Sequence, residues 1–229
     1  MFWFLQHDIT FESALIQILA ILAVIFFSLP FHEFAHAWVA YKFGDNTAKI
    51  RGLLKINFID TFDPLGAVSV LIFNFGWARP IPTDSKNLQN PKKNLTLISL
   101  AGPVSNLAVS IISGLIVNIL VSFKFYSISS IFLKKIYIFL SYFIMTNVRI
   151  SVLNLIPLPS LDGFNIFISF LPEKIYVRYF KYHNLITLSL IFLVFLGIFD
   201  IPLRFLESVF YNSIILITRF PFIFLENLL

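Results

Sequence analysis

Residues 14–43 have the sequence ALIQILAILAVIFFSLPFHEFAHAWVAYKF, in which a long apolar run leads directly into a cluster of ionisable side chains. Residues 14–30 contain no charged residue. A helix of about 20 apolar residues is long enough to cross the hydrocarbon core of a bilayer. The stretch therefore predicts one long helix that spans a membrane and carries His32, Glu33 and His36 beyond its apolar part.

The two histidines of this cluster are spaced for metal binding. His32 and His36 are four positions apart, so on a helix they lie one turn apart on the same face and can share one Zn²⁺. Glu33 lies beside that face, where a carboxylate can act as the general base of a hydrolase. The alternative is a purely structural cluster. An ionisable residue at the centre of a membrane helix costs about 2.5–3.5 kcal/mol, which favours the metal site.

A catalytic zinc site needs a third protein ligand and an open position. The chain has no cysteine, so this ligand must be His, Asp or Glu. Asp162 is favoured because it follows Pro157 and Pro159, which break a helix at membrane depth, where an unpaired carboxylate is costly. Gly163 permits a tight turn beside it. The other candidates stay open, namely Asp60, Asp63, Asp200, Glu173 and His183.

The composition as a whole is that of a membrane protein. Of the 229 residues, 58% are hydrophobic and 13% are charged, whereas soluble proteins average about 45–50% and about 25%. The net charge is +5, but the basic residues are spread between the apolar runs and form no dense patch. We therefore expect the lipid bilayer, and no nucleic acid, as a partner.

Further apolar runs predict an all-α polytopic fold with about 4–6 transmembrane helices. They cover residues 95–123, 136–155, 185–199 and 205–229, the last being either a span or an interfacial helix. Residues 63–82 are too short an apolar stretch to cross as a helix and predict a short membrane-associated β-hairpin or re-entrant loop. The sequence shows no repeat or long soluble insert, which predicts a single domain over residues 1–229.

The distribution of basic residues predicts an orientation. No Lys or Arg precedes Lys42, whereas residues 42–93 carry eight. By the positive-inside rule, this segment faces the cytoplasm and the N-terminus faces outward, although Lys134 and Lys135 run against the rule. We expect a multi-pass protein of the cell (inner or plasma) membrane whose active site opens toward the cytoplasm. The first apolar run lacks a cleavage site, so we expect no removable signal peptide.

Four motifs occur in the order HEFAHAWVAYKFGD, GWARPIP, SLAGPVSN and NLIPLPSLDG. With them the chain resembles the small members of the site-2 protease family, peptidase family M50, which lack PDZ and CBS domains. The resemblance covers the core motif region 29–164, which leaves additional C-terminal membrane helices at 183–229. It implies one Zn²⁺ per chain held by His32, His36 and Asp162, with Glu33 as catalytic base.

The resemblance also implies roles for residues outside the ligand set. Asn154 is expected near the substrate backbone or the developing oxyanion, and the GxxxN element of the family falls on Gly102 and Asn106. Helix–helix hydrogen bonding is an equal alternative for each asparagine, and Gly102 is expected to serve packing. Phe164 departs from the small residue that relatives often carry there. Arg149 is an unusual charge for its helix and is expected to pair with a carboxylate.

The function implied by the resemblance is that of a zinc-dependent intramembrane endopeptidase. Its substrate would be a transmembrane or membrane-anchored helix, cut either in regulated intramembrane proteolysis or in the clearance of signal-peptide remnants. One alternative is a divalent-metal transporter, which would need a polar path through both leaflets and often repeated halves, and the sequence shows neither. The other alternative is a catalytically silent binding partner. Such a protein would usually have lost Glu33 or a metal ligand, and all of these residues are present here.

Overall fold

The computed structural model describes residues 10–73, 76–122, 131–158, 161–172, 189 and 200–226. Every regular element within these residues is a helix, and no strand occurs among them. The described helical stretches that are long and apolar enough to cross a membrane are Phe11–Lys42, Pro91–Val121, Ile131–Asn154 and Ile201–Arg219. The predicted all-α polytopic membrane fold is confirmed.

The first of these stretches is continuous but not uniform. It consists of α1 (Phe11–Ala23), a π-helical turn η2 (Val24–Ser28) and α2 (Leu29–Lys42). Pro30 accounts for the wide turn, because it has no N–H to donate and its ring collides with the carbonyl four residues earlier in a regular α-helix. In η2 the Leu29 N–H donates to the Val24 carbonyl, five residues back, which opens the turn before the proline.

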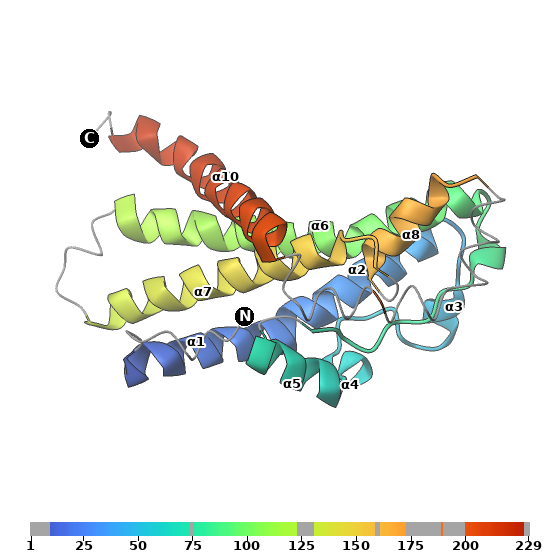
Figure 1. Cartoon of the computed structure of the whole chain (residues 1–229), viewed down its shortest axis with the longest axis horizontal. Helices are drawn as coiled ribbons and strands as arrows, with labels where there is room; N and C mark the ends of the chain where they lie inside the picture. Colours follow the sequence, from blue (N-terminus) through green and yellow to red (C-terminus); the bar gives the residue numbers. More distant parts are fainter. Residues whose placement is uncertain are drawn as a thin grey trace.

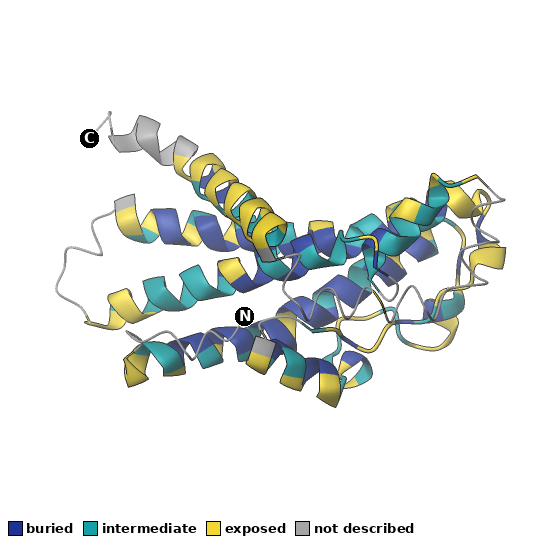
Figure 2. Ribbon diagram, viewed as in Figure 1, coloured by how far each residue is buried: buried dark blue, intermediate teal, exposed yellow. Residues whose placement is uncertain are grey.

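The long helices form a bundle in which α6 (Pro91–Ser122) is central. It packs against α2, against α7 (Ile131–Asn154) and against α10 (Asp200–Glu226), and α1 packs against α7 (Figure 1). Buried residues line the inner faces of α1, α2, α6 and α7, whereas α10 is largely exposed (Figure 2). The apolar outer faces are those expected of helices in contact with lipid.

The predicted spans agree with these helices where the structure describes them. Residues 95–123 and 136–155 correspond to α6 and α7, and the apolar stretch at 205–229 is part of α10. The predicted span at 185–199 lies outside the described residues, apart from residue 189. Of the C-terminal region at 183–229, the structure thus describes chiefly α10.

Of the two alternatives for residues 63–82, the β-hairpin is wrong for the described residues. The segment folds as α5 (Pro64–Phe73) followed by a return segment without regular secondary structure from residue 76. Asp63 starts the helix, since its Oδ1 accepts the Gly66 N–H at 2.8 Å, and proline is favoured at a first helical position. A Cβ on Gly66 would overlap the backbone of Trp77, so the helix and the return segment meet backbone to backbone.

Short helices complete the described chain. They are α3 (Thr47–Ile50), α4 (Phe58–Thr61), η3 (Ser85–Asn87) and α8 (Asp162–Ser169). The last of these packs against α6, where Thr96 Oγ1 donates to Ser169 Oγ at 2.7 Å. This contact brings a segment from the second half of the chain to the α2–α6 pair.

Candidate metal centre

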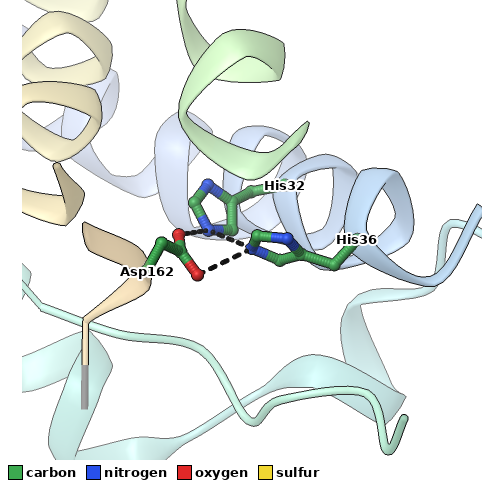
Figure 3. A group of neighbouring side chains, drawn as sticks. All are labelled: His32, His36 and Asp162. Carbon is green, nitrogen blue, oxygen red and sulfur yellow. Dashed lines mark hydrogen bonds and ion pairs between the residues drawn. The ribbon is translucent and has the colours of Figure 1, made fainter. Parts of the chain in front are cut away.

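Three side chains converge at the contact between α2 and α8 (Figure 3). His32 Nε2 lies 3.1 Å from Asp162 Oδ2, and His36 Nε2 lies 3.2 Å from Asp162 Oδ1. The two imidazole Nε2 atoms are 3.0 Å apart. One ligand atom from each residue lies within 4.8 Å of the others, so the group can hold one metal ion. Among the described residues, no other group of three His, Asp or Glu side chains is so arranged.

The break after α7 brings Asp162 to the histidines. α7 ends at Asn154, and the chain turns through Pro157 before α8 starts at Asp162. A Cβ on Gly163 would overlap the carbonyls of Leu155 and Ile156, so only glycine allows α8 to begin this close to the end of α7. The predicted tight approach beside Asp162 is thus present.

The hydrogen bonds of the site fix where its lone pairs point. His36 Nδ1 lies 2.6 Å from the Ile98 carbonyl, which can only accept, so Nδ1 carries a hydrogen, and in the neutral ring that binds a metal Nε2 keeps its lone pair. That lone pair faces His32 Nε2 and the Asp162 carboxylate. Burial acts to raise the pKa of Asp162, but the two imidazoles beside its carboxylate outweigh burial and hold that pKa at about 2. A largely enclosed set of converging nitrogen and oxygen ligand atoms suits a divalent cation.

Gly102 lies directly against both imidazoles. A Cβ at this position would overlap His36 Nε2 and would lie 2.5 Å from His32 Nε2 and Cε1. The backbone of α6 therefore forms one wall of the group, and any larger side chain would occupy the space of the rings. This close approach supports the packing role predicted for Gly102.

Glu33 is buried beside the group and is held by a backbone donor. Its Oε2 accepts the Ile81 N–H at 3.2 Å. Ile81 was not among the predicted site residues, although its sequence context contains a signal. It lies between Pro80 and Pro82, so its N–H is the only backbone donor in that tripeptide, and a residue before proline is biased toward extended backbone.

Asp45 is a second residue that the sequence analysis missed. It is 2% exposed. Its Oδ2 accepts the Asp84 N–H at 2.7 Å, and its Oδ1 accepts from Asn87 Nδ2 at 2.9 Å. It thus ties the end of α2 to the chain just beyond Ile81. Burial acts to raise the pKa of Asp45, but hydrogen bonds from Thr47, Asn87 and Asp84 lower it overall.

The remaining predicted residues lie around the ligand group. Asn154 is the last residue of α7 and is partly exposed, whereas Asn106 is fully buried on α6, one turn beyond Gly102. Arg149 donates from Nε and Nη2 to the two carboxylate oxygens of Glu207, both at 2.9 Å, so its predicted pairing is confirmed. That ion pair joins α7 to α10 and lies apart from the ligand group.

The alternative third ligands are not brought to the histidines where they are described. Asp60 pairs with Lys55 at 3.2 Å, and Asp63 caps α5. Asp200 is the first residue of α10. Glu173 and His183 lie outside the described residues.

Comparison with known proteins gives one informative similarity. No family model matches the chain, and no solved structure matches it significantly. The chain is 37% identical over 193 residues to the protein named "Putative zinc metalloprotease YwhC" of Bacillus subtilis (strain 168), and the match covers 84% of each chain. Such identity over most of both chains reaches well beyond the short histidine motif.

Proposed function

This chain belongs to the site-2 protease family of membrane zinc metalloproteases, and from that premise we propose that it is a zinc-dependent intramembrane endopeptidase. Its substrates would be transmembrane or membrane-anchored segments of other proteins. The observation that carries the proposal is the convergence of His32, His36 and Asp162 within 4.8 Å, beside the buried Glu33. Residues 1–229 would act as one domain.

The ligand group would hold one Zn²⁺ per chain. A zinc ion held there would supply Lewis-acid chemistry, lowering the pKa of a water molecule toward about 7 and polarising a substrate carbonyl. The protein contributes three donors that already face one another and a buried setting that strengthens charge interactions. Hydrogen bonding of His36 to Ile98 keeps its Nε2 directed at the site.

Glu33 is the proposed general base. One carboxylate oxygen is fixed by the Ile81 N–H at 3.2 Å, and the other can take a proton from water and transfer it to the leaving amine. The position of Glu33 next to His32 in the sequence and on α2 keeps this proton transfer beside the scissile bond.

Asn154 is the proposed contact to the substrate backbone or to the developing oxyanion. It ends α7, eight residues before Asp162, and its amide can donate to a carbonyl oxygen. A helical substrate must unwind before its peptide bond is accessible. The non-helical segment that follows residue 76 lies beside Glu33, and the residues before Pro80 and Pro82 favour extended backbone, which can bind an unwound segment by β-addition.

The charge distribution supports an orientation for this function. The N-terminus would lie outside the cell membrane, and the site would open toward the cytoplasm, where residues 42–93 carry eight basic side chains. Signalling by release of a membrane-tethered regulator and clearance of signal-peptide remnants both fit this arrangement.

The test is Glu33→Gln in the purified full chain. We expect cleavage of a single-span membrane substrate to be abolished while zinc content stays unchanged, because the amide cannot act as a base. The matched control is Glu12→Gln on the same helical run, where the carboxylate pairs with Lys135 at an exposed position. Retained cleavage in Glu33→Gln would contradict the proposal, as would zinc transport across vesicles by both variants without proteolysis.

A further inference from the structure

The two imidazoles of the metal centre differ in their outer nitrogens. His36 Nδ1 donates to the Ile98 carbonyl, whereas His32 Nδ1 is buried without a hydrogen-bond partner among the described residues. In Figure 3 this nitrogen points away from Asp162, on the side of the α6 ribbon. A metal-bound histidine almost always donates its second ring N–H to a carboxylate, a carbonyl or a water molecule. No described protein group around His32 therefore supplies this partner.

Further polar atoms without partners lie on the helices that surround His32. Asn106 on α6 is fully buried, and neither its Oδ1 nor its Nδ2 has a partner among the described residues. The same holds for Asn147 Oδ1 on α7 and Ser28 Oγ in η2, both of which are almost completely buried. In a bundle of apolar helices, such atoms call for a ligand that can hydrogen-bond.

The helix contacts bring these atoms to one level of the bundle. α2 and α6 run antiparallel (Figure 1). His36 contacts the Ile98 carbonyl, and Gly102, one turn further along α6, lies against both His36 and His32. One turn back from His32 is Ser28, and one turn on from Gly102 is Asn106, so both lie in the layer next to His32.

The third helix adds Asn147 to this layer. Ser151 on α7 donates to the Pro103 carbonyl of α6 at 2.9 Å. Asn147 is one turn before Ser151 on the same helix face, and α7 also runs antiparallel to α6 (Figure 1). It therefore lies level with Asn106 at the α6–α7 contact, which completes a buried polar layer formed by α2, α6 and α7.

We propose that Asn106 and Asn147, together with Ser28, bind an internal water molecule that accepts the Nδ1–H of His32. A water that accepts this hydrogen has two hydrogens of its own to donate, and the amide oxygens of Asn106 and Asn147 are the acceptors. The bond holds His32 in the tautomer whose Nε2 lone pair faces Asp162. Asn106 and Asn147 are thus positioning residues for the ligand, an inference that rests on the proposed zinc site.

The test compares Asn106→Leu with Asn118→Leu, the same substitution three turns along α6. Asn118 is buried too, but its Nδ2 donates to Thr218 Oγ1 at 2.8 Å and lies far from the ligands. Zinc affinity of the purified full chain is measured by competition with a chelator. We expect Asn106→Leu to lower it by about 10–100-fold and Asn118→Leu to leave it unchanged. Equal affinities of the two variants would overturn the inference while leaving the proposed zinc site intact.

A second measurement is independent of bound metal. Nitrogen NMR of the four imidazoles in metal-free protein reports which ring nitrogen of His32 carries the hydrogen. We expect Nδ1–H with slow solvent exchange in the unmodified chain and loss of that slow exchange in Asn106→Leu. If Asn106→Leu does not fold, Asn147→Ala is the second variant. It removes the other proposed acceptor of the same water, on α7, and should have the same effect. A solvent-exchanging or Nε2–H form in the unmodified chain would refute the water bridge, whether or not the chain binds zinc.

Discussion

The two halves of α6 carry the same pair of residues at the same spacing but use them differently. In the half near the metal centre, Gly102 lies against two imidazoles, and Asn106 has no partner among the described residues. In the other half, a Cβ on Gly114 would lie 3.0 Å from Thr218 Oγ1, and Asn118 donates to that hydroxyl at 2.8 Å. The GxxxN spacing itself therefore predicts close helix packing. Whether the asparagine joins two helices, as Asn118 does, or lies beside the metal centre, as Asn106 does, depends on which helix packs there.

The largest effect in this comparison should come from the two glycines. Gly102→Ala is expected to lower zinc affinity by about 100-fold or more, because the added Cβ overlaps the ligand nitrogens. Gly114→Ala should keep its zinc, since the new Cβ meets Thr218 and Ile214 on α10 and no ligand. Metal analysis of both purified variants after dialysis makes the measurement. Full zinc content in Gly102→Ala would contradict the different roles assigned to the two halves of α6.

The ion pair between α7 and α10 tests whether the packing of α10 contributes to stability alone or also to zinc binding. Arg149→Met is expected to lower the free energy of unfolding by about 1–3 kcal/mol, because it leaves the partly buried Glu207 carboxylate unpaired. Arg149→Met combined with Glu207→Met should recover much of that loss. Unfolding in mixed detergent micelles measures the stability. Folded Arg149→Met should bind zinc as the unmodified chain does, and a matching loss of zinc affinity would show that α10 also supports the site.

A substitution at Asp45 changes the surroundings of Glu33 without altering any of the three proposed ligands. Asp45→Asn is expected to cost about 1–3 kcal/mol and to slow cleavage more than it weakens zinc binding, because Asp45 anchors the segment that carries the Ile81 N–H. Asp84→Asn is the matched control, since its side chain only caps η3. A parallel loss of zinc affinity and cleavage in Asp45→Asn would contradict this separation.

The same residue predicts a pH dependence. The pKa of Asp45 is lowered in the folded protein, so its stabilising contribution is present above about pH 4 and is lost as the pH falls through the folded value. The difference in unfolding free energy between the unmodified chain and Asp45→Asn should therefore shrink in acid. A difference that stays constant down to pH 3 would mean that the carboxylate charge is not involved.

The smallest effect should come from the hydrogen bond between α6 and α10. Thr218→Val removes the hydroxyl that accepts from Asn118 and should cost about 0.6–1.7 kcal/mol, the range found between membrane helices. Zinc affinity and cleavage should not change. The measurement is the unfolding midpoint of Thr218→Val. The control is Ser208→Ala, because the Ser208 hydroxyl donates to a carbonyl of its own helix.

Much of the metal centre could be predicted from the sequence because its chemistry is local. His32, Glu33 and His36 occupy one helical turn, and Asp162 follows a helix that its prolines must end. Their assembly in the structure agrees with that prediction, and their role as ligands stays a prediction. Ile81 and Asp45 were missed because one acts through its backbone N–H and the other is an ordinary loop residue until the fold brings Asp84 to it.

The prediction of a hairpin at residues 63–82 was wrong for a different reason. The stretch is rich in β-branched and aromatic residues, which favour strands in general. Asp63 and Pro64 form a strong helix start, however, and Ala67 and Val70 then fall on one helix face that packs into the core. The local capping signal and the burial of that face outweigh strand propensity here.

The π-helical turn η2 sets the rotational phase between the two parts of the first span. One residue of a helix corresponds to about 100° of rotation, so the wider turn before Pro30 decides which way α2 faces relative to α1. Removing one residue from Val24–Ser28 would leave the apolar part of the helix intact and turn the imidazoles by about 100° relative to α1, away from Asp162. The direction in which His32 and His36 face is thus set separately from the position of the apolar part of the helix.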